Sequence, residues 1–219
     1  MMRESYEKSL AALNDSLLQM GMLIETAIAG AVTALKSKDL ALARKVMEQD
    51  YVIDTKEKEI AGLCVSLLLL QQPVASDLRM VTAASRIISD MERIGDQAAD
   101  ISEIVLAMES DDYCQYLGEI GAMAENAIGM LNDSIDAYVH QDLSLVKKVR
   151  AQDDTVDALF VKAKDSMADR LWNHARQNKC AIDLIMIAKY FERIADHSVN
   201  IANWTEFCKT GYYKSARII

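Results

Sequence analysis

The chain contains the same sequence pattern twice, about one hundred residues apart. The segment DLALARKVMEQDYVID at 39–54 aligns without a gap with DLSLVKKVRAQDDTVD at 142–157, and eight of the sixteen positions are identical. MERIGDQAADI at 91–101 likewise aligns with FERIADHSVNI at 191–201. A repeat of this length predicts that the whole protein is one structural unit present two times.

Each unit has the apolar spacing of a helical bundle. In the first helix of each unit, within 10–35 and 117–138, apolar residues follow one another at steps of three and four. The 219 residues include one proline and eight glycines, too few for the turns of an all-β chain. We therefore predict an all-α fold of two tandem antiparallel three-helix bundles, residues 1–110 and residues 111–219. One continuous six-helix array is the alternative.

Composition excludes several classes of protein. Acidic residues outnumber basic ones by 33 to 24, and the resulting net charge of −9 repels phosphate backbones, so we expect no nucleic-acid binding. The longest apolar run, Leu63–Leu70, is too short for a membrane span, which needs roughly 20 residues. The first residues lack the apolar core of a signal peptide, and the four cysteines have no close spacing. We expect a soluble, cytoplasmic protein.

The informative acidic residues lie on the apolar seams of the predicted helices. They form pairs four residues apart, at equivalent places in the two units: Asp50 and Asp54, Glu92 and Asp96, Asp153 and Asp157, Glu192 and Asp196. Each such pair destabilises a helix by about 0.2–0.5 kcal/mol. A multivalent cation would offset the repulsion, and all-oxygen sites suit hard metals. The alternative is that the acids are solvated or paired with Arg93 and Arg193.

The segments ERIGDQAADI and FERIADHSVNIA resemble the two signature segments of the PhoU family. The chain length, the tandem three-helix units and the four acidic pairs agree with this family, so the resemblance covers essentially the whole chain. It implies metal clusters, often multinuclear iron, on the surface formed by the second and third helices of each unit. Iron is the first expectation, and manganese, zinc, magnesium or calcium are the other divalent or trivalent candidates.

Carried over residue by residue, the resemblance implies two metal sites. The first is Asp50, Asp54, Glu92 and Asp96, and the second is Asp153, Asp157, Glu192 and Asp196. Asp100 is a less secure ligand of the first site, because its counterpart is Asn200. His197 has Gln97 as its counterpart, and three roles stay open for it: a ligand, a residue that supports a ligand, or a hydrogen-bonded histidine between helices.

The resemblance also implies a regulatory function and no enzymatic activity. Proteins of this family restrain phosphate uptake by the phosphate ABC transporter and, in many bacteria, restrain the sensor histidine kinase of the phosphate regulon. They are cytoplasmic, commonly homodimers, and reach the membrane only through protein partners.

Two other functions stay open on the residues alone. One is a metal-free helical adaptor whose acidic pairs bind a basic partner surface. The other is a di-metal carboxylate enzyme, which needs a Glu-x-x-His motif on two helices. The residues three after Glu92 and Glu192 are Gly95 and Ala195, so the imidazoles of such a centre are missing.

Overall fold

The structure, a computed structural model, describes residues 2–71, 76–108, 117–173, 179–214 and 216–217. Six long helices carry nearly all of these residues, and a short two-stranded hairpin follows the last of them. The elements are α1 (Met2–Ser37), α2 (Leu40–Gln71), α3 (Ser76–Ala107), α4 (Leu117–His140), α5 (Leu143–Asn173), α6 (Lys179–Thr210), β1 (Tyr212–Tyr213) and β2 (Ala216–Arg217).

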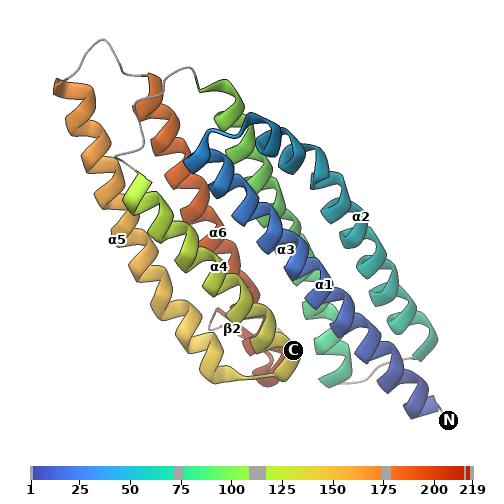
Figure 1. Ribbon diagram of the computed structural model, residues 1–219. Helices are drawn as coiled ribbons and strands as arrows, with labels where there is room; N and C mark the ends of the chain where they lie inside the picture. The colour runs from blue at the N-terminus through green and yellow to red at the C-terminus, as the bar shows by residue number, and fades with distance from the viewer. Residues whose placement is uncertain (1, 72–75, 109–116, 174–178, 215, 218–219) are drawn as a thin grey trace.

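The helices form two three-helix bundles, as predicted from the repeat. The first unit is α1–α3 and the second unit is α4–α6, and within each unit every helix packs against the next. In Figure 1, α2 and α5 lie at the two outer edges, with the other four helices between them. The predicted domain boundary between residues 110 and 111 lies outside the described residues.

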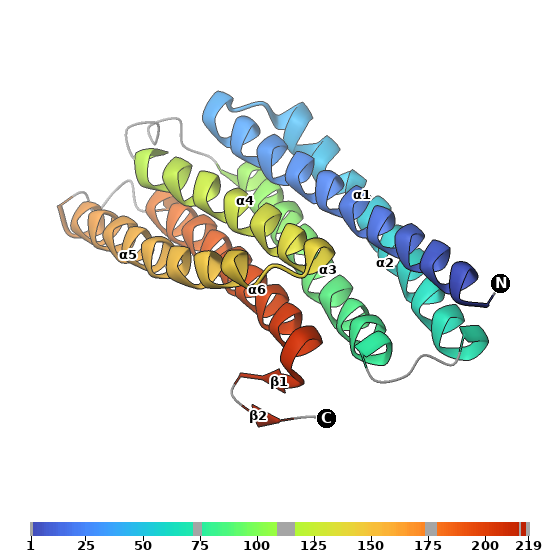
Figure 2. The ribbon, with the colours of Figure 1, turned by 90° about the horizontal axis from the view of Figure 1, so that it is seen from below.

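The two bundles share one apolar core. Contacts between units join α3 to α6 and α1 to α4, which lie side by side in Figures 1 and 2. Paired residues along α3 and α6, such as Arg79 with Cys208 and Asp90 with His197, show that these two helices are antiparallel. Fully buried side chains from both units, including Leu17, form one continuous cluster. The repeat therefore forms two bundles that are stabilised together.

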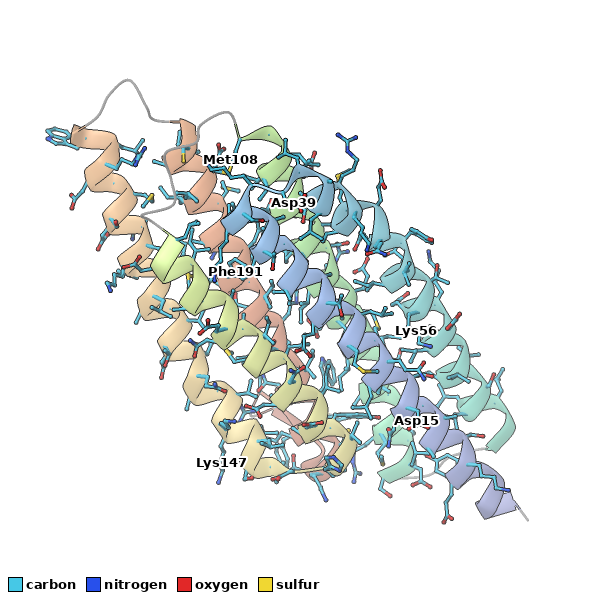
Figure 3. The ribbon with its side chains drawn as sticks, in the orientation of Figure 1. Asp15, Asp39, Lys56, Met108, Lys147 and Phe191 are labelled. Carbon is cyan, nitrogen blue, oxygen red and sulfur yellow. The ribbon has the colours of Figure 1, made fainter. Side chains whose placement is uncertain are left out.

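Matching caps begin α2 and α5. The carboxylate of Asp39, labelled in Figure 3, accepts a hydrogen bond of 2.9 Å from the backbone N–H of Leu42. Asp142 accepts one of 2.7 Å from the N–H of Ser144. Lys38, directly before Asp39, has a positive φ of 57°. Such caps satisfy backbone donors that a helix leaves unpaired at its first turn.

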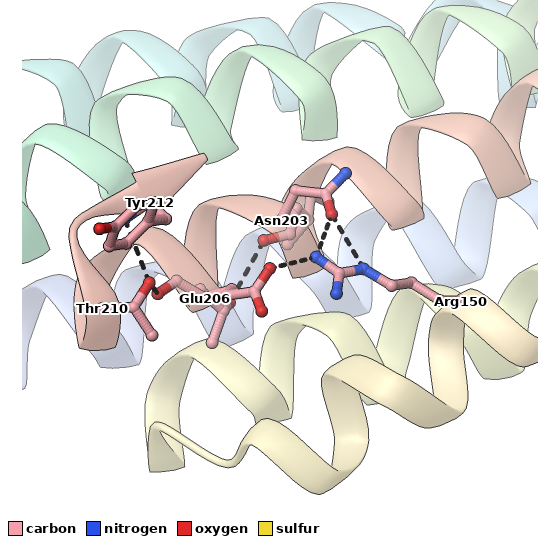
Figure 4. A network of polar contacts seen from close by, with 7 residues as sticks. Arg150, Asn203, Glu206, Thr210 and Tyr212 are labelled. Carbon is pink, nitrogen blue, oxygen red and sulfur yellow. Dashed lines mark hydrogen bonds and ion pairs between the residues drawn. The ribbon is translucent and has the colours of Figure 1, made fainter. Parts of the chain in front are cut away.

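A polar network holds the end of α6 against α5 (Figure 4). The Arg150 guanidinium on α5 donates through Nε to Oδ1 of Asn203, at 3.0 Å, and forms an ion pair with Glu206. Beyond the helix, the Tyr213 ring stacks on Trp204 with 4.1 Å between ring centroids. This stacking holds the C-terminal hairpin against α6.

Candidate metal centre

The first site lies where α2 and α3 pack together in the first unit. Asp50 and Asp54 are one turn apart on α2, and Asp96 lies on α3. One carboxylate oxygen from each of these half-buried residues lies within 4.8 Å of the others. The tertiary structure therefore brings together three of the four acidic residues predicted for this site.

A glycine lets the two helices approach closely beside these carboxylates. A Cβ atom at Gly95 would lie 3.0 Å from Cδ1 and Cγ2 of Ile53 and 3.5 Å from Oδ1 of Asp50. Ile53 is itself buried, so it has little room to move away. The missing side chain at position 95 thus keeps Asp50 close to α3.

The carboxylates of the first site repel one another in a partly dry environment. Burial, followed by the charges of Asp96, Asp54 and Asp100, raises the pKa of Asp50 to about 6. Burial and the Asp96 charge also raise the pKa of Glu92, and the Arg93 guanidinium opposes this shift. Glu92 and Asp100 therefore lie within the electrostatic field of the cluster.

Arg93 is the cation that the structure places at the first site. Its guanidinium lies 3.0 Å from Asp96 and 3.5 Å from Glu92, but 60 % of its side chain is exposed. An exposed ion pair contributes little to stability and exchanges readily with solvent. This arginine can therefore leave the carboxylates free for a stronger cation.

The second site lies between α5 and α6 and has the same four predicted acids. Burial, followed by the charges of Asp157, Asp196, Asp154 and Glu192, raises the pKa of Asp153 to about 6. Asp157 and Asp196 are exposed here, whereas their counterparts Asp54 and Asp96 are half-buried. Within the described residues, the compact group of three carboxylates occurs at the first site. The second site is thus the more open of the two.

A lysine is a second difference between the two sites. Lys189 pairs with Glu192, and its ammonium lies 5.4 Å from the centroid of the Phe160 ring. In the first unit the counterparts of these two residues are Ser89 and Glu57. The first site therefore has an acid, Glu57, in place of Phe160, and it has no counterpart of the cation that Lys189 supplies to the second site. Sequence reasoning missed this difference, although the alignment of the units contains it.

The structure places the two less secure residues at the contact between α3 and α6. The Nδ1 atom of His197 lies 2.8 Å from Oδ1 of Asp90, and the Asn200 side chain contacts the same oxygen at 3.4 Å. Burial, followed by the charge of the nearby Asp100, raises the pKa of Tyr190. His197 thus has the contacts of a histidine hydrogen-bonded between helices, one of the three roles that the sequence leaves open.

The donor set of the first site fits a hard cation. It consists of carboxylate oxygens from two adjacent helices, held close enough for one ion to contact several of them. A bound cation would also relieve the mutual repulsion that raises the pKa of Asp50. Carboxylate oxygens make up this donor set without an imidazole or a thiolate.

Comparison with known proteins places the chain in a family. The family model described as the PhoU domain matches twice, at residues 17–105 and 120–205. The phosphate-specific transport system accessory protein PhoU homolog of Clostridium acetobutylicum is 31 % identical over 212 residues, which cover 96 % of this chain and 97 % of that protein. The homolog of Aquifex aeolicus is 34 % identical over 85 % of this chain and 84 % of its own.

Solved structures agree with these relatives. The crystal structure of PhoU from Pseudomonas aeruginosa matches with a TM-score of 0.87 and 29 % identity, over 94 % of this chain and all of that chain. The phosphate transport system regulatory protein PhoU from Streptococcus pneumoniae matches with a TM-score of 0.85 and 25 % identity, over 95 % and 98 % of the two chains. The doubled PhoU domain and these relatives define a regulatory accessory protein and not an enzyme. The chain belongs to the PhoU family.

Proposed function

We propose that this protein restrains phosphate uptake through the phosphate ABC transporter and dampens phosphate-regulon signalling when phosphate is plentiful. The observation that carries the proposal is the match of the PhoU domain to both units. Relatives that align over nearly the whole chain are named accessory proteins of phosphate-specific transport. The protein acts in the cytoplasm, as a homodimer, by contacts with the transporter and with a phosphate-sensing histidine kinase.

The test of this regulatory function is a strain from which the gene is deleted. In phosphate-rich medium, the deletion is expected to raise phosphate uptake and the expression of phosphate-starvation genes, and the wild-type gene should restore both. If neither quantity changes, the regulatory proposal is wrong.

We further propose that the acidic pairs bind metal ions. Asp50, Asp54, Glu92 and Asp96 would hold the first site, with Asp153, Asp157, Glu192 and Asp196 at the second. The compact carboxylates of the first site and the raised pKa of Asp50 support this proposal. Iron is the first candidate, with manganese, zinc, magnesium and calcium as others, and the metal would supply a positive charge that links α2 to α3.

Elemental analysis of protein purified without chelator tests metal binding. The wild type is expected to contain stoichiometric metal, and the combined variant Asp50→Asn, Asp96→Asn should lose the ions of the first site. Glu48→Gln is the matched control, because Glu48 is an exposed acid on the same helix. Wild-type protein without stoichiometric metal would favour the metal-free adaptor instead.

A further inference from the structure

An open groove of about 720 Å³ runs between α1 and α2, and it is lined by residues of these two helices alone. It continues along the same helix pair into a second hollow of about 630 Å³. We define the α1–α2 groove by Met22, Thr26 and Gly30 of α1 and by Lys45 and Val46 of α2. Figure 3 labels Lys56, which lines its continuation.

The groove exists because α1 is apolar on two faces. One face is buried in the core, where Leu17, Met20 and Ile24 have no exposed surface. The other face leaves Met22 59 % exposed, and the stretch Tyr6–Ser37 is long and apolar enough, by length and composition only, to cross a membrane. A surface helix of a soluble bundle normally has one apolar face and one polar face. The second apolar face of α1 therefore lacks a cover within the described residues.

Ion pairs bridge the equivalent seam of the second unit. Between α4 and α5, Lys148 pairs with Asp133 at 2.7 Å and Lys162 pairs with Glu119 at 3.2 Å. The counterparts of the first pair are Lys45 and Thr33, and those of the second are Glu59 and Gln19. Neither ion pair has a counterpart in the first unit, because Thr33 and Gln19 stand in place of the two acids.

Lys45 indicates the charge of a surface that would fit the groove. This exposed lysine lines the groove and has no ion pair among the described residues, while its counterpart Lys148 contacts a carboxylate. Glu25 of α1 also lines the groove, but its carboxylate accepts a hydrogen bond of 3.3 Å from the side-chain amide of Asn132 on α4. Lys45 is therefore the charged group of the groove that an acid on an otherwise apolar partner surface would complement.

We propose that the α1–α2 groove binds an amphipathic helix of a partner protein, with apolar residues against Met22 and the partly buried Val52, which lines both hollows, and with a carboxylate against Lys45. From Gln19 to Thr33 the groove follows α1 for about 20 Å, enough for roughly four turns of helix. The bound helix would complete a four-helix bundle, opposite α3. The proposal rests on the proposed function, because it assigns a surface to the protein contact by which the regulator acts.

Site-specific photo-crosslinking in cells identifies the occupant. A photoreactive residue replaces Met22 in the groove and, as a control, Val161, which is exposed on α5. Met22 is expected to crosslink to one helical segment of the transporter or the kinase, with apolar residues at helical spacing and an acid among them, and Val161 is not. Crosslinks from Met22 to a second copy of the chain, to lipid or to no protein would overturn the proposal.

A synthetic peptide of the crosslinked segment then tests the charge contact. Lys45→Glu and Thr33→Asp are each expected to weaken peptide binding about tenfold, the first by repulsion and the second by giving Lys45 an internal partner. Lys148→Glu is the matched control and should leave binding unchanged. Replacing the acid of the peptide by lysine should restore binding to the Lys45→Glu variant. Equal binding by all variants contradicts the proposal.

These results separate the two levels of inference. If the wild-type protein fails to associate with either the transporter or the kinase, the proposed function fails. If it associates but Met22 does not crosslink, the groove is not the contact surface, and the proposed function stands.

Discussion

The Nδ1 atom of His197 lies 2.8 Å from Oδ1 of Asp90, where α6 of the second unit crosses α3 of the first. Asn200 contacts the same aspartate. The counterparts of Asp90 and Asn200 are Tyr190 and Asp100, and these two residues are also neighbours, because burial followed by the charge of Asp100 raises the pKa of Tyr190. An approximate two-fold axis therefore relates the two halves of the contact between α3 and α6, although the residues at the equivalent positions differ.

The pair of Asp90 and His197 is expected to couple the two units. Both side chains are more than four-fifths buried, so removing one leaves the other without its partner in a place that is poor in water. A double-mutant cycle with Asp90→Ala and His197→Ala, measured by urea unfolding, should give an interaction free energy of about 1–2 kcal/mol. Additive effects of the two substitutions would mean that the contact does not stabilise the protein.

Gly95 should respond differently from another helical glycine. Replacing an exposed glycine within a helix by alanine stabilises it by about 1 kcal/mol, and Gly62→Ala should do so, because nothing lies within 4 Å of the added Cβ. Gly95→Ala should gain clearly less or lose stability, since its Cβ would lie 3.0 Å from Ile53. Urea unfolding of the two variants compares them directly, and an equal gain at both positions would contradict the packing described here.

Stability of the metal-free protein should depend on pH through Asp50. The pKa of Asp50 is raised to about 6 in the fold, so the folded state holds this proton more tightly than the unfolded chain. The stabilisation of the fold by protonated Asp50 is fully present below about pH 4, and it is lost as the pH rises through about 6. Asp50→Asn should therefore be more stable relative to the wild type at pH 7 than at pH 4. Thermal melts with chelator at both pH values test this difference, and a constant difference would contradict it.

Acid should also weaken metal binding. Protons compete with the cation for Asp50 and Asp153, whose pKa values are both raised to about 6. The affinity for Mn²⁺, measured by calorimetry, is therefore expected to fall as the pH is lowered from about 7.5 to about 5.5. The Asp50→Asn, Asp153→Asn variant should bind more weakly with a shallower pH dependence. An unchanged wild-type affinity over this range would argue against binding through these carboxylates.

Lys189 is expected to lower the cation affinity of the second site. It pairs with Glu192, and the equivalent position in the first unit is Ser89. Lys189→Ser should strengthen Mn²⁺ binding at the second site about tenfold, and Ser89→Lys should weaken binding at the first site by a similar factor. Calorimetry on protein with the other site removed by Asp→Asn substitutions measures each effect. Unchanged affinities in both variants would show that Lys189 moves aside without cost.

Local periodicity determined much of what could be predicted here. Helical spacing of apolar residues and the repeat led to six helices in two units, because these signals depend on residues three or four apart. The same spacing placed Asp50 and Asp54 on one face of α2. It could not reveal Gly95 as the point of close approach, since that role depends on Ile53, which belongs to a different helix.

Contacts between helices were decided only by the tertiary structure. The sequence by itself determined the helices, the two units and the acidic pairs, all of which follow from the turn of a single helix. The tertiary structure decided that Asp96 meets Asp50 and Asp54, that His197 meets Asp90, and that one seam is an open groove while the other is bridged by Lys148. Such contacts join residues far apart in the chain, and they depend on how side chains of both helices fit together, which no local pattern records.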